Sequence, residues 1–156
     1  MLQRLAGQRT GQAVTYELLD LDRNDPALFG QTFERCKADG FHGVNVTHPF
    51  KELAAARVRI DDPLVRAIGA VNTVLFDGGE PRGFNTDHSG FLRAYHGRFG
   101  ETSPGSVALV GTGGVGRAIA FALAALGATE IRLFDVDAAK AQALAEALRS
   151  ANPKVD

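Results

Sequence analysis

Hydrophobic and polar positions divide residues 1–100 into segments that alternate between strand-like and helix-like spacing. Residues 13–21 alternate as a half-buried strand does, and residues 24–40 follow with apolar side chains at helical spacing. In that helix, Asp25 is a candidate N-cap and Pro26 lies in the first turn. A strand followed by a helix then occurs again, so the pattern predicts an α/β unit.

Further along, two short helices, a hairpin and a longer helix are predicted. The hairpin turn signal is Asp77-Gly78-Gly79, which lies between two strand-like runs. The predicted elements are a strand over 42–47, helices over 49–58 and 61–68, strands over 69–77 and 81–87, and a helix over 88–99. Residues 100–106 are polar and rich in turn formers, and we place a domain boundary there.

After this boundary the pattern becomes that of a nucleotide-binding unit. Residues 107–110 form a short apolar strand of the buried parallel kind. Three glycines follow with the spacing G-x-G-x-x-G, namely Gly111, Gly113 and Gly116. An alanine-rich helix ends at Gly127, and a second strand over 131–134 ends in Asp135. A lone glycine motif is a weak signal, but this complete context is typical of the opening of a dinucleotide-binding fold.

The glycine-rich turn is the predicted seat of the cofactor pyrophosphate. Gly113 and Gly114 leave room for a phosphate against the main chain, and the helix start near Val115 offers unpaired N–H groups and the positive end of a dipole. The candidate cofactor-binding residues are Gly111, Thr112, Gly113, Gly114, Val115, Asp135 and Lys140.

Asp135 carries the prediction about which cofactor binds. Its carboxylate is placed to accept hydrogen bonds from the adenosine ribose hydroxyls. Because the 2′-phosphate of NADP would bring a second negative group beside Asp135, NAD is the predicted cofactor. Lys140, one turn into the next helix, leaves room for some tolerance of NADP. Asp135 and Asp137 also fit as caps of the helix over 138–150, which is compatible with cofactor binding.

Composition and charge are those of an ordinary globular protein. Of the 156 residues, 45% are hydrophobic and 22% are charged, and the formal net charge is -1. No apolar run approaches the roughly 18 residues of a membrane span, and the N-terminus lacks the apolar stretch of a signal peptide. We therefore expect a cytoplasmic protein that binds small molecules, with no nucleic-acid or membrane partner, and the pattern predicts no metal site.

Cys36 is the only cysteine, so no internal disulfide can form, as is usual in a reducing compartment. It lies at helical spacing from Phe29 and Phe33. This spacing favours a buried structural thiol over a nucleophile.

Four motifs occur in one order along nearly the whole chain: GVNVTHPFKE, GAVNTV, GFNTDHSGF and VGTGGVGRA. In combination they resemble the shikimate and quinate dehydrogenases. The resemblance implies an α/β protein with a substrate-binding domain over residues 1–100 and a Rossmann domain over residues 101–156. It also implies that both domains are incomplete, the first without its initial strand and the second without its second half. Members of this family reduce the ring ketone of 3-dehydroshikimate or 3-dehydroquinate with a nicotinamide cofactor, in a cleft between the domains.

The resemblance also implies roles for four side chains. Lys51 and Asp87 match the catalytic lysine and aspartate, and Thr47 and Asn72 match substrate-binding residues. An ammonium group bonded to the reacting oxygen can donate a proton as hydride reaches carbon. From the residues alone, Lys51 also fits a solvated surface lysine, Asp87 an N-cap and Thr47 an inert strand residue. Asn72 is more telling, because asparagine is depleted in strand interiors.

His48 and His88 match no catalytic position of the family, and we expect His88, near a helix start, to be exposed. His48 resembles the NAD-using quinate/shikimate branch, which agrees with Asp135. Asn45 and Asn85 are expected to link segments through side-chain hydrogen bonds.

Two other functions stay open. The first is a non-catalytic NAD-binding or sensor relative, or an inactive fragment of such an enzyme, and the presence of Lys51 and Asp87 argues against it. The second is another two-domain NAD enzyme, such as a folate or amino-acid dehydrogenase, and the NVTHPFK and NTD motifs argue against that. We expect the 156-residue chain by itself to be weakly active or inactive. The sequence leaves the choice between shikimate and quinate, and the oligomeric state, open.

Overall fold

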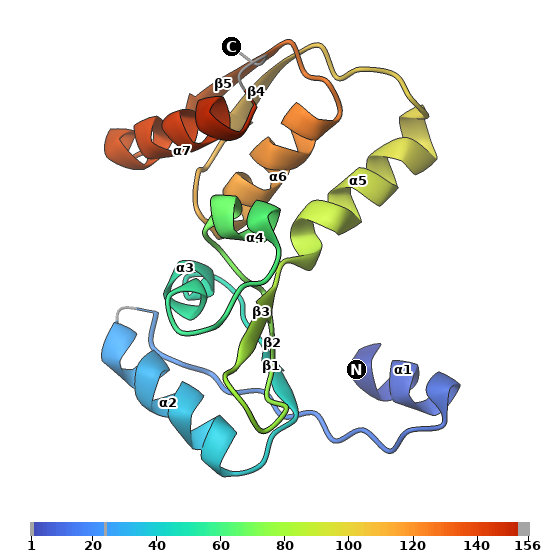
Figure 1. Ribbon diagram of the computed structural model, residues 1–156, viewed down its shortest axis with the longest axis vertical. Helices are drawn as coiled ribbons and strands as arrows, with labels where there is room; N and C mark the ends of the chain where they lie inside the picture. The colour runs from blue at the N-terminus through green and yellow to red at the C-terminus, as the bar shows by residue number, and fades with distance from the viewer. Residues whose placement is uncertain (1, 24, 153–156) are drawn as a thin grey trace.

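The fold is described by a computed structural model over residues 2–23 and 25–152 (Figure 1). In chain order the elements are α1 (Leu2–Thr10), α2 (Pro26–Ala38), β1 (Gly43–Asn45), α3 (Lys51–Ala55), α4 (Pro63–Ile68), β2 (Thr73–Leu75), β3 (Arg82–Phe84), α5 (Thr86–Phe99), β4 (Ser106–Val110), α6 (Gly114–Ala125), β5 (Glu130–Phe134) and α7 (Ala138–Ala151). The predicted α/β class is confirmed.

Two sheets organise the described residues. The first has three antiparallel strands in the order β1-β2-β3, with Val44 opposite Val74 and Val74 opposite Gly83. The second is the parallel pair β4-β5, with Val107 opposite Ile131. Helix α6 supplies the crossover that a parallel pair needs. The predicted hairpin and the predicted strand-helix-strand unit are therefore both present.

The starts of α2, α4 and α7 follow the predicted local signals. The Asp25 carboxylate accepts a hydrogen bond from the N–H of Leu28 at 2.9 Å, and Pro26 begins α2. Asp62 and Asp137 cap α4 and α7 in the same way. These aspartates satisfy N–H groups that a helix start leaves unpaired.

The predicted strand over residues 13–21 is wrong, because this segment is extended but pairs with no described strand. A groove of about 1000 Å³ lies between its first part and β1. A strand is stabilised by hydrogen bonds to a neighbouring strand, and residues 13–21 have no such partner among the described residues. The short helix α3 also starts at Lys51 and not at Pro49, since Thr47 to Phe50 form a turn closed by a 3.0 Å bond from Phe50 N to Thr47 O.

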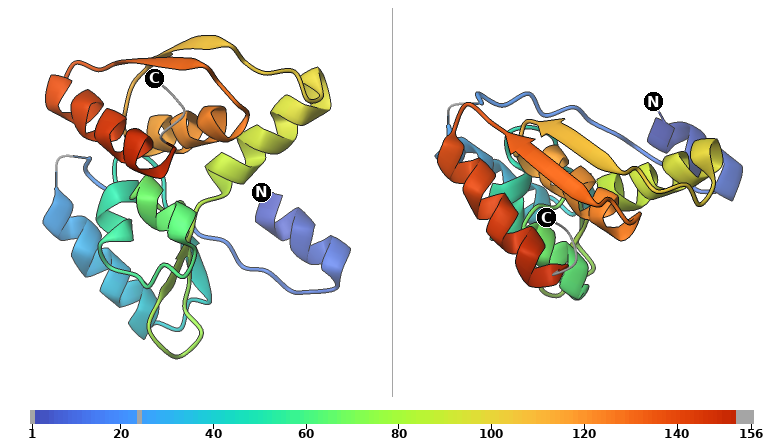
Figure 2. Two further views of the ribbon diagram at one scale, coloured as in Figure 1. Left: turned by 45° about the horizontal axis from the view of Figure 1, so that its top comes forward. Right: turned by 90° about the horizontal axis from the view of Figure 1, so that it is seen from above.

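Two hydrophobic cores meet at α4. In the first, Phe29 stacks on Phe50 with ring centroids 4.9 Å apart, and Val65 and Val71 join this cluster. In the second, Ile68 is packed with side chains of α6 and α7. In the left view of Figure 2, α4 (green) lies between α2 and α3 (blue and teal) and α6 and α7 (orange and red). Val65 and Ile68, three residues apart on α4, thus belong to different cores. Because both cores are closely packed, α4 fixes the two sheets relative to each other.

Helix α5 runs along α6, and α4 contacts both α6 and α7. The domain boundary that we placed at residues 100–106 stays a prediction. No helix in the described part of the chain is long and apolar enough to cross a membrane.

Candidate active site

Lys51, which is buried, and Asp87, which is partly buried, form an ion pair. Lys51 Nζ lies 2.5 Å from Asp87 Oδ2, and the two side chains are 10% and 25% exposed. The residues are 36 positions apart in sequence. Lys51 is the first residue of α3, where the helix dipole disfavours a cation, and Asp87 lies in the first turn of α5, where it favours an anion. The α5 carboxylate therefore offsets the unfavourable position of the ammonium group.

The interpretation of Asp87 as an N-cap is wrong, because Asn85 performs that function. Asn85 Oδ1 accepts hydrogen bonds from the N–H groups of Asp87 and His88 at 3.0 and 3.1 Å. Asn85 Nδ2 donates to Ala70 O at 2.9 Å. The carboxylate of Asp87 is thereby left for Lys51. Asn85 also links segments, as expected.

Asn72 lies just before β2 and bonds to the start of α5. Its Oδ1 accepts a hydrogen bond from Thr86 N at 3.0 Å, and its Nδ2 lies 2.9 Å from Thr86 Oγ1. These hydrogen bonds to Thr86 give Asn72 a structural role, which accounts for an asparagine next to a strand. An amide group has two N–H donors, so one donor remains for a ligand.

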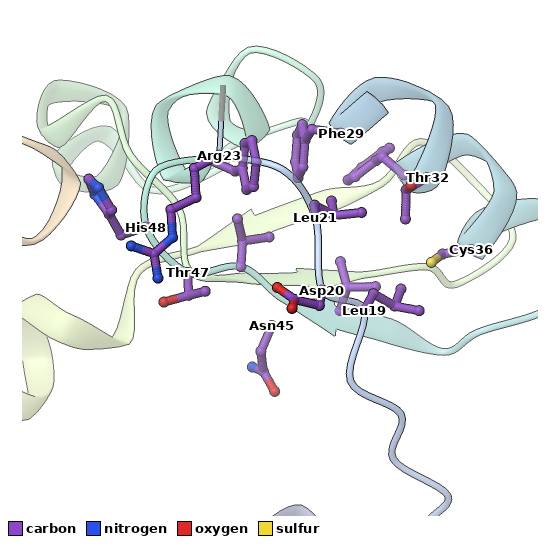
Figure 3. A pocket seen from close by; sticks show the side chains of 14 residues that line it. Leu19, Asp20, Leu21, Arg23, Phe29, Thr32, Cys36, Asn45, Thr47 and His48 are labelled. Atoms are coloured by element: carbon purple, nitrogen blue, oxygen red, sulfur yellow. The ribbon is translucent and has the colours of Figure 1, made fainter. Parts of the chain in front are cut away.

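Thr47 is exposed and lines a cavity of about 160 Å³ between the segment 19–23, α2 and β1. Figure 3 shows Arg23, Thr47 and His48 at one end of this cavity and Thr32 and Cys36 at the other. Neither side chain of the ion pair lines it. Of the predicted site residues, Thr47 alone lines this cavity, and most of the cavity wall is apolar. Cys36 is buried, as its spacing predicted.

The expectation that His88 is exposed is wrong. His88 is 7% exposed, and its Nε2 has no hydrogen-bond partner among the described residues. Burial lowers the pKa of the imidazole, against a smaller opposing effect of Asp62. The helix starts at Thr86, two residues earlier than predicted, and this turns His88 inward. His48, by contrast, is exposed.

The glycines of the nucleotide motif have separate roles. Gly111 has a φ of 93°, which other residues rarely adopt. A Cβ at Gly116 would overlap the carbonyl oxygen of Gly111, so this glycine lets the helix approach the turn. Gly113 faces open space and is the N-cap of α6. The N–H groups that begin α6 are the donors available to a phosphate. Val115, which follows, is exposed.

Gly114 joins the glycine-rich turn to the ion pair. A Cβ at Gly114 would lie 2.8 Å from the Cβ of Lys51 and 3.4 Å from that of Ala70. Nearby, Arg117 Nε donates a hydrogen bond to Ile68 O at the end of α4. Sequence reasoning missed both contacts, because each connects segments far apart in the chain.

Asp135 is fixed by its own chain. Its Oδ2 accepts hydrogen bonds from the N–H and the hydroxyl of Thr112, each at 2.7 Å, and its Oδ1 accepts one from Asp137 N at 3.0 Å. The Asp137 N–H, then the Thr112 hydroxyl and N–H, lower the pKa of Asp135 to about 2. The positive charge of Lys140 acts in the same direction. No group of three or more His, Cys, Asp or Glu in the described ranges is arranged to hold a metal ion.

Known proteins resemble this chain in sequence and in fold. The family described as "Shikimate dehydrogenase substrate binding domain" matches residues 1–74. The quinate/shikimate dehydrogenase (NAD(+)) of Corynebacterium efficiens is 34% identical over 148 residues, which are 93% of this chain and 52% of that protein. The shikimate dehydrogenase (NADP(+)) of Streptomyces avermitilis is 38% identical over 148 residues, 94% of this chain and 50% of that protein.

The fold is similar to that of quinate dehydrogenase from Corynebacterium glutamicum in complex with NAD, with a TM-score of 0.84 and 32% identity over 99% of this chain and 57% of that one. The chain spans about half the length of the curated relatives it matches. Sequence and fold agree, and the chain belongs to the shikimate and quinate dehydrogenase family.

Proposed function

We propose that the chain carries the acid–base centre of an oxidoreductase that transfers hydride between a nicotinamide cofactor and the ring C3 position of shikimate or quinate. The observation that carries this proposal is the partly buried Lys51–Asp87 pair, 2.5 Å between Nζ and Oδ2, in contact with the glycine-rich turn through Gly114. Relatives named for both substrates and both cofactors support the reaction class.

In the direction of reduction, Lys51 Nζ donates a proton to the ketone oxygen while the ring carbon receives a hydride. The carbonyl π bond breaks, and a C–H and an O–H bond form. Asp87 orients the ammonium group and can bind a neighbouring ring hydroxyl through its other oxygen. In the reverse direction, neutral Lys51 accepts the hydroxyl proton. Asn72 and Thr47 are the proposed contacts to further substrate groups.

We assign the cofactor site to the turn at Gly111–Val115 and to Asp135. When bound, the cofactor supplies or accepts the hydride. The open face at Gly113 and the first N–H groups of α6 fit a pyrophosphate. Asp135 favours NAD, because its carboxylate stays ionised and repels a 2′-phosphate. Lys140 is the basic group from which a limited tolerance of NADP would come.

The experiment compares Lys51→Ala with the wild type and with Lys37→Ala, a control that removes an exposed lysine from α2. Nicotinamide absorbance is followed with shikimate and with quinate, and NAD binding is measured by calorimetry. We expect Lys51→Ala to lose turnover by about 10²-fold or more, as for removal of a general acid, and to keep NAD binding. The control should retain both.

Unchanged turnover in Lys51→Ala would contradict the role given to this lysine. NAD binding without measurable turnover in the wild-type chain would agree with the expectation of an inactive fragment and would not distinguish it from a non-catalytic NAD-binding relative. Absence of NAD binding would contradict the cofactor site.

A further inference from the structure

Thr112 and Asp135 form a hydrogen-bonded unit at the end of the parallel sheet. Thr112 directs both of its donors, the main-chain N–H and the side-chain hydroxyl, at the same carboxylate oxygen, Asp135 Oδ2, and each distance is 2.7 Å. The N–H of Asp137 holds the other oxygen at 3.0 Å. A carboxylate offers about four acceptor positions, so these three bonds leave one, and it is on Oδ1.

The environment of Thr112 accounts for this arrangement. Thr112 is only 1% exposed, although it lies between two residues of the glycine turn that are partly exposed. A hydroxyl buried to this degree needs a partner, and its partner is Asp135. The side chain is thus directed away from the open face at Gly113, where a phosphate would lie. A direct contact of the Thr112 hydroxyl with the pyrophosphate does not fit this geometry.

We propose that Thr112 is a positioning residue for cofactor selectivity. It fixes the Asp135 carboxylate so that Oδ1 alone is available to the adenosine ribose and the negative charge cannot turn away from a 2′-phosphate. The inference rests on the proposed function, because it takes the dinucleotide site as given. It adds the group that makes Asp135 selective.

The electrostatics support this assignment. Hydrogen bonds to the ionised form hold the pKa of Asp135 at about 2, so the carboxylate is charged at any pH at which the protein would be assayed. Lys140 is near enough to favour that charge. A carboxylate free to rotate could pair with Lys140 and leave room for a phosphate. A carboxylate held at Oδ2 by two donors lacks this freedom.

The test uses variants that separate the hydroxyl from the shape of the side chain. Thr112→Val keeps the branched shape and removes the hydroxyl, whereas Thr112→Ser keeps the hydroxyl. Calorimetry measures the Kd values of NAD⁺ and NADP⁺ for each chain. We expect Thr112→Val to reduce the NADP⁺/NAD⁺ ratio of Kd values about tenfold, the scale of one hydrogen bond to a charged group. Thr112→Ser should keep the wild-type ratio.

A double-mutant cycle completes the test. Asp135→Ala should abolish the preference, and Thr112→Val should then have no further effect on the ratio. If Thr112→Val weakens the binding of NAD⁺ and NADP⁺ equally and leaves the ratio of Kd values unchanged, the inference is overturned. Loss of a merely structural hydroxyl would loosen the whole turn and affect both cofactors alike. Thr112→Ala carries the same prediction if Thr112→Val does not fold, as judged by circular dichroism.

The failure of the proposed function has a different signature. If the wild-type chain binds neither cofactor, the dinucleotide site is wrong and the inference falls with it. If the wild type binds NADP⁺ more tightly than NAD⁺, the dinucleotide site stands, but the NAD preference assigned to Asp135 and the inference about Thr112 are both overturned.

Discussion

Gly114 lies directly against Lys51, so that the turn opening α6 and the residue opening α3 share one contact surface. A Cβ at Gly114 would be 2.8 Å from the Cβ of Lys51 and 3.2 Å from its Cδ. Carbon atoms in van der Waals contact are about 3.5–4.0 Å apart, so a side chain here would displace the lysine stem. The glycine therefore connects the proposed cofactor turn with the proposed proton donor.

Gly114→Ala should lower kcat more than it weakens NAD binding. The added methyl group moves Lys51 relative to Asp87, and a displacement of about 1 Å can cost up to about 10²-fold in rate. The comparison is Gly113→Ala, where a Cβ meets open space in the protein and would meet the proposed pyrophosphate. That variant should mainly raise the Kd of NAD. The same kinetic change in both variants would argue against a specific contact with Lys51.

Asn85→Ala should destabilise the protein and reduce turnover together. It removes the acceptor for two N–H groups of α5 and the donor to Ala70 O. A lost N-cap costs about 1 kcal/mol, and the unpaired carbonyl adds a similar amount. Urea unfolding measures the loss. Asn85→Asp keeps the N-cap acceptor but not the donor to Ala70 O. Its free energy of unfolding should therefore fall between those of Asn85→Ala and the wild type. A loss of stability as large as that of Asn85→Ala would mean that the cap contributes little.

Arg117→Met should lower the free energy of unfolding by about 1–2 kcal/mol, because Ile68 O at the end of α4 would lose the Nε donor. Methionine keeps most of the apolar stem. Arg93→Met, at an exposed position of α5, is the matched control and should change stability little. If both variants unfold at the same urea concentration as the wild type, the contact does not stabilise the junction at α4.

His88 should make the protein less stable as the pH falls from 7.5 to 5.5. Its pKa is lowered in the folded state by burial, so below the ordinary value of 6.5 the unfolded chain binds a proton that the folded chain excludes. The contribution of neutral His88 to the free energy of unfolding is therefore present above pH 6.5 and is lost progressively below it. Urea unfolding at both pH values should show a smaller difference for His88→Gln than for the wild type. An equal difference in the two proteins would assign the pH dependence to other groups.

Several features of the fold were predictable because they depend on neighbours within a few residues. Asp25, Asp62 and Asp137 precede helices and cap them, and Gly78 lies in the hairpin turn with a φ of 86°. The strand, glycine turn, helix and second strand also follow from local spacing. The limits of α5 were less accurate, although an asparagine at position 85 is itself an N-cap signal.

The sequence by itself determined the α/β class, the nucleotide motif and, through the family motifs, the pairing of Lys51 with Asp87 as a hypothesis. Only the tertiary structure decided that Lys51 is buried, that Asn85 frees Asp87 from capping, that His88 lies inside, and that residues 13–21 are not a strand. The physical reason is the sequence separation over which each interaction acts. Caps and turns act over about four residues, whereas burial and ion pairing depend on segments brought together where the two cores meet at α4.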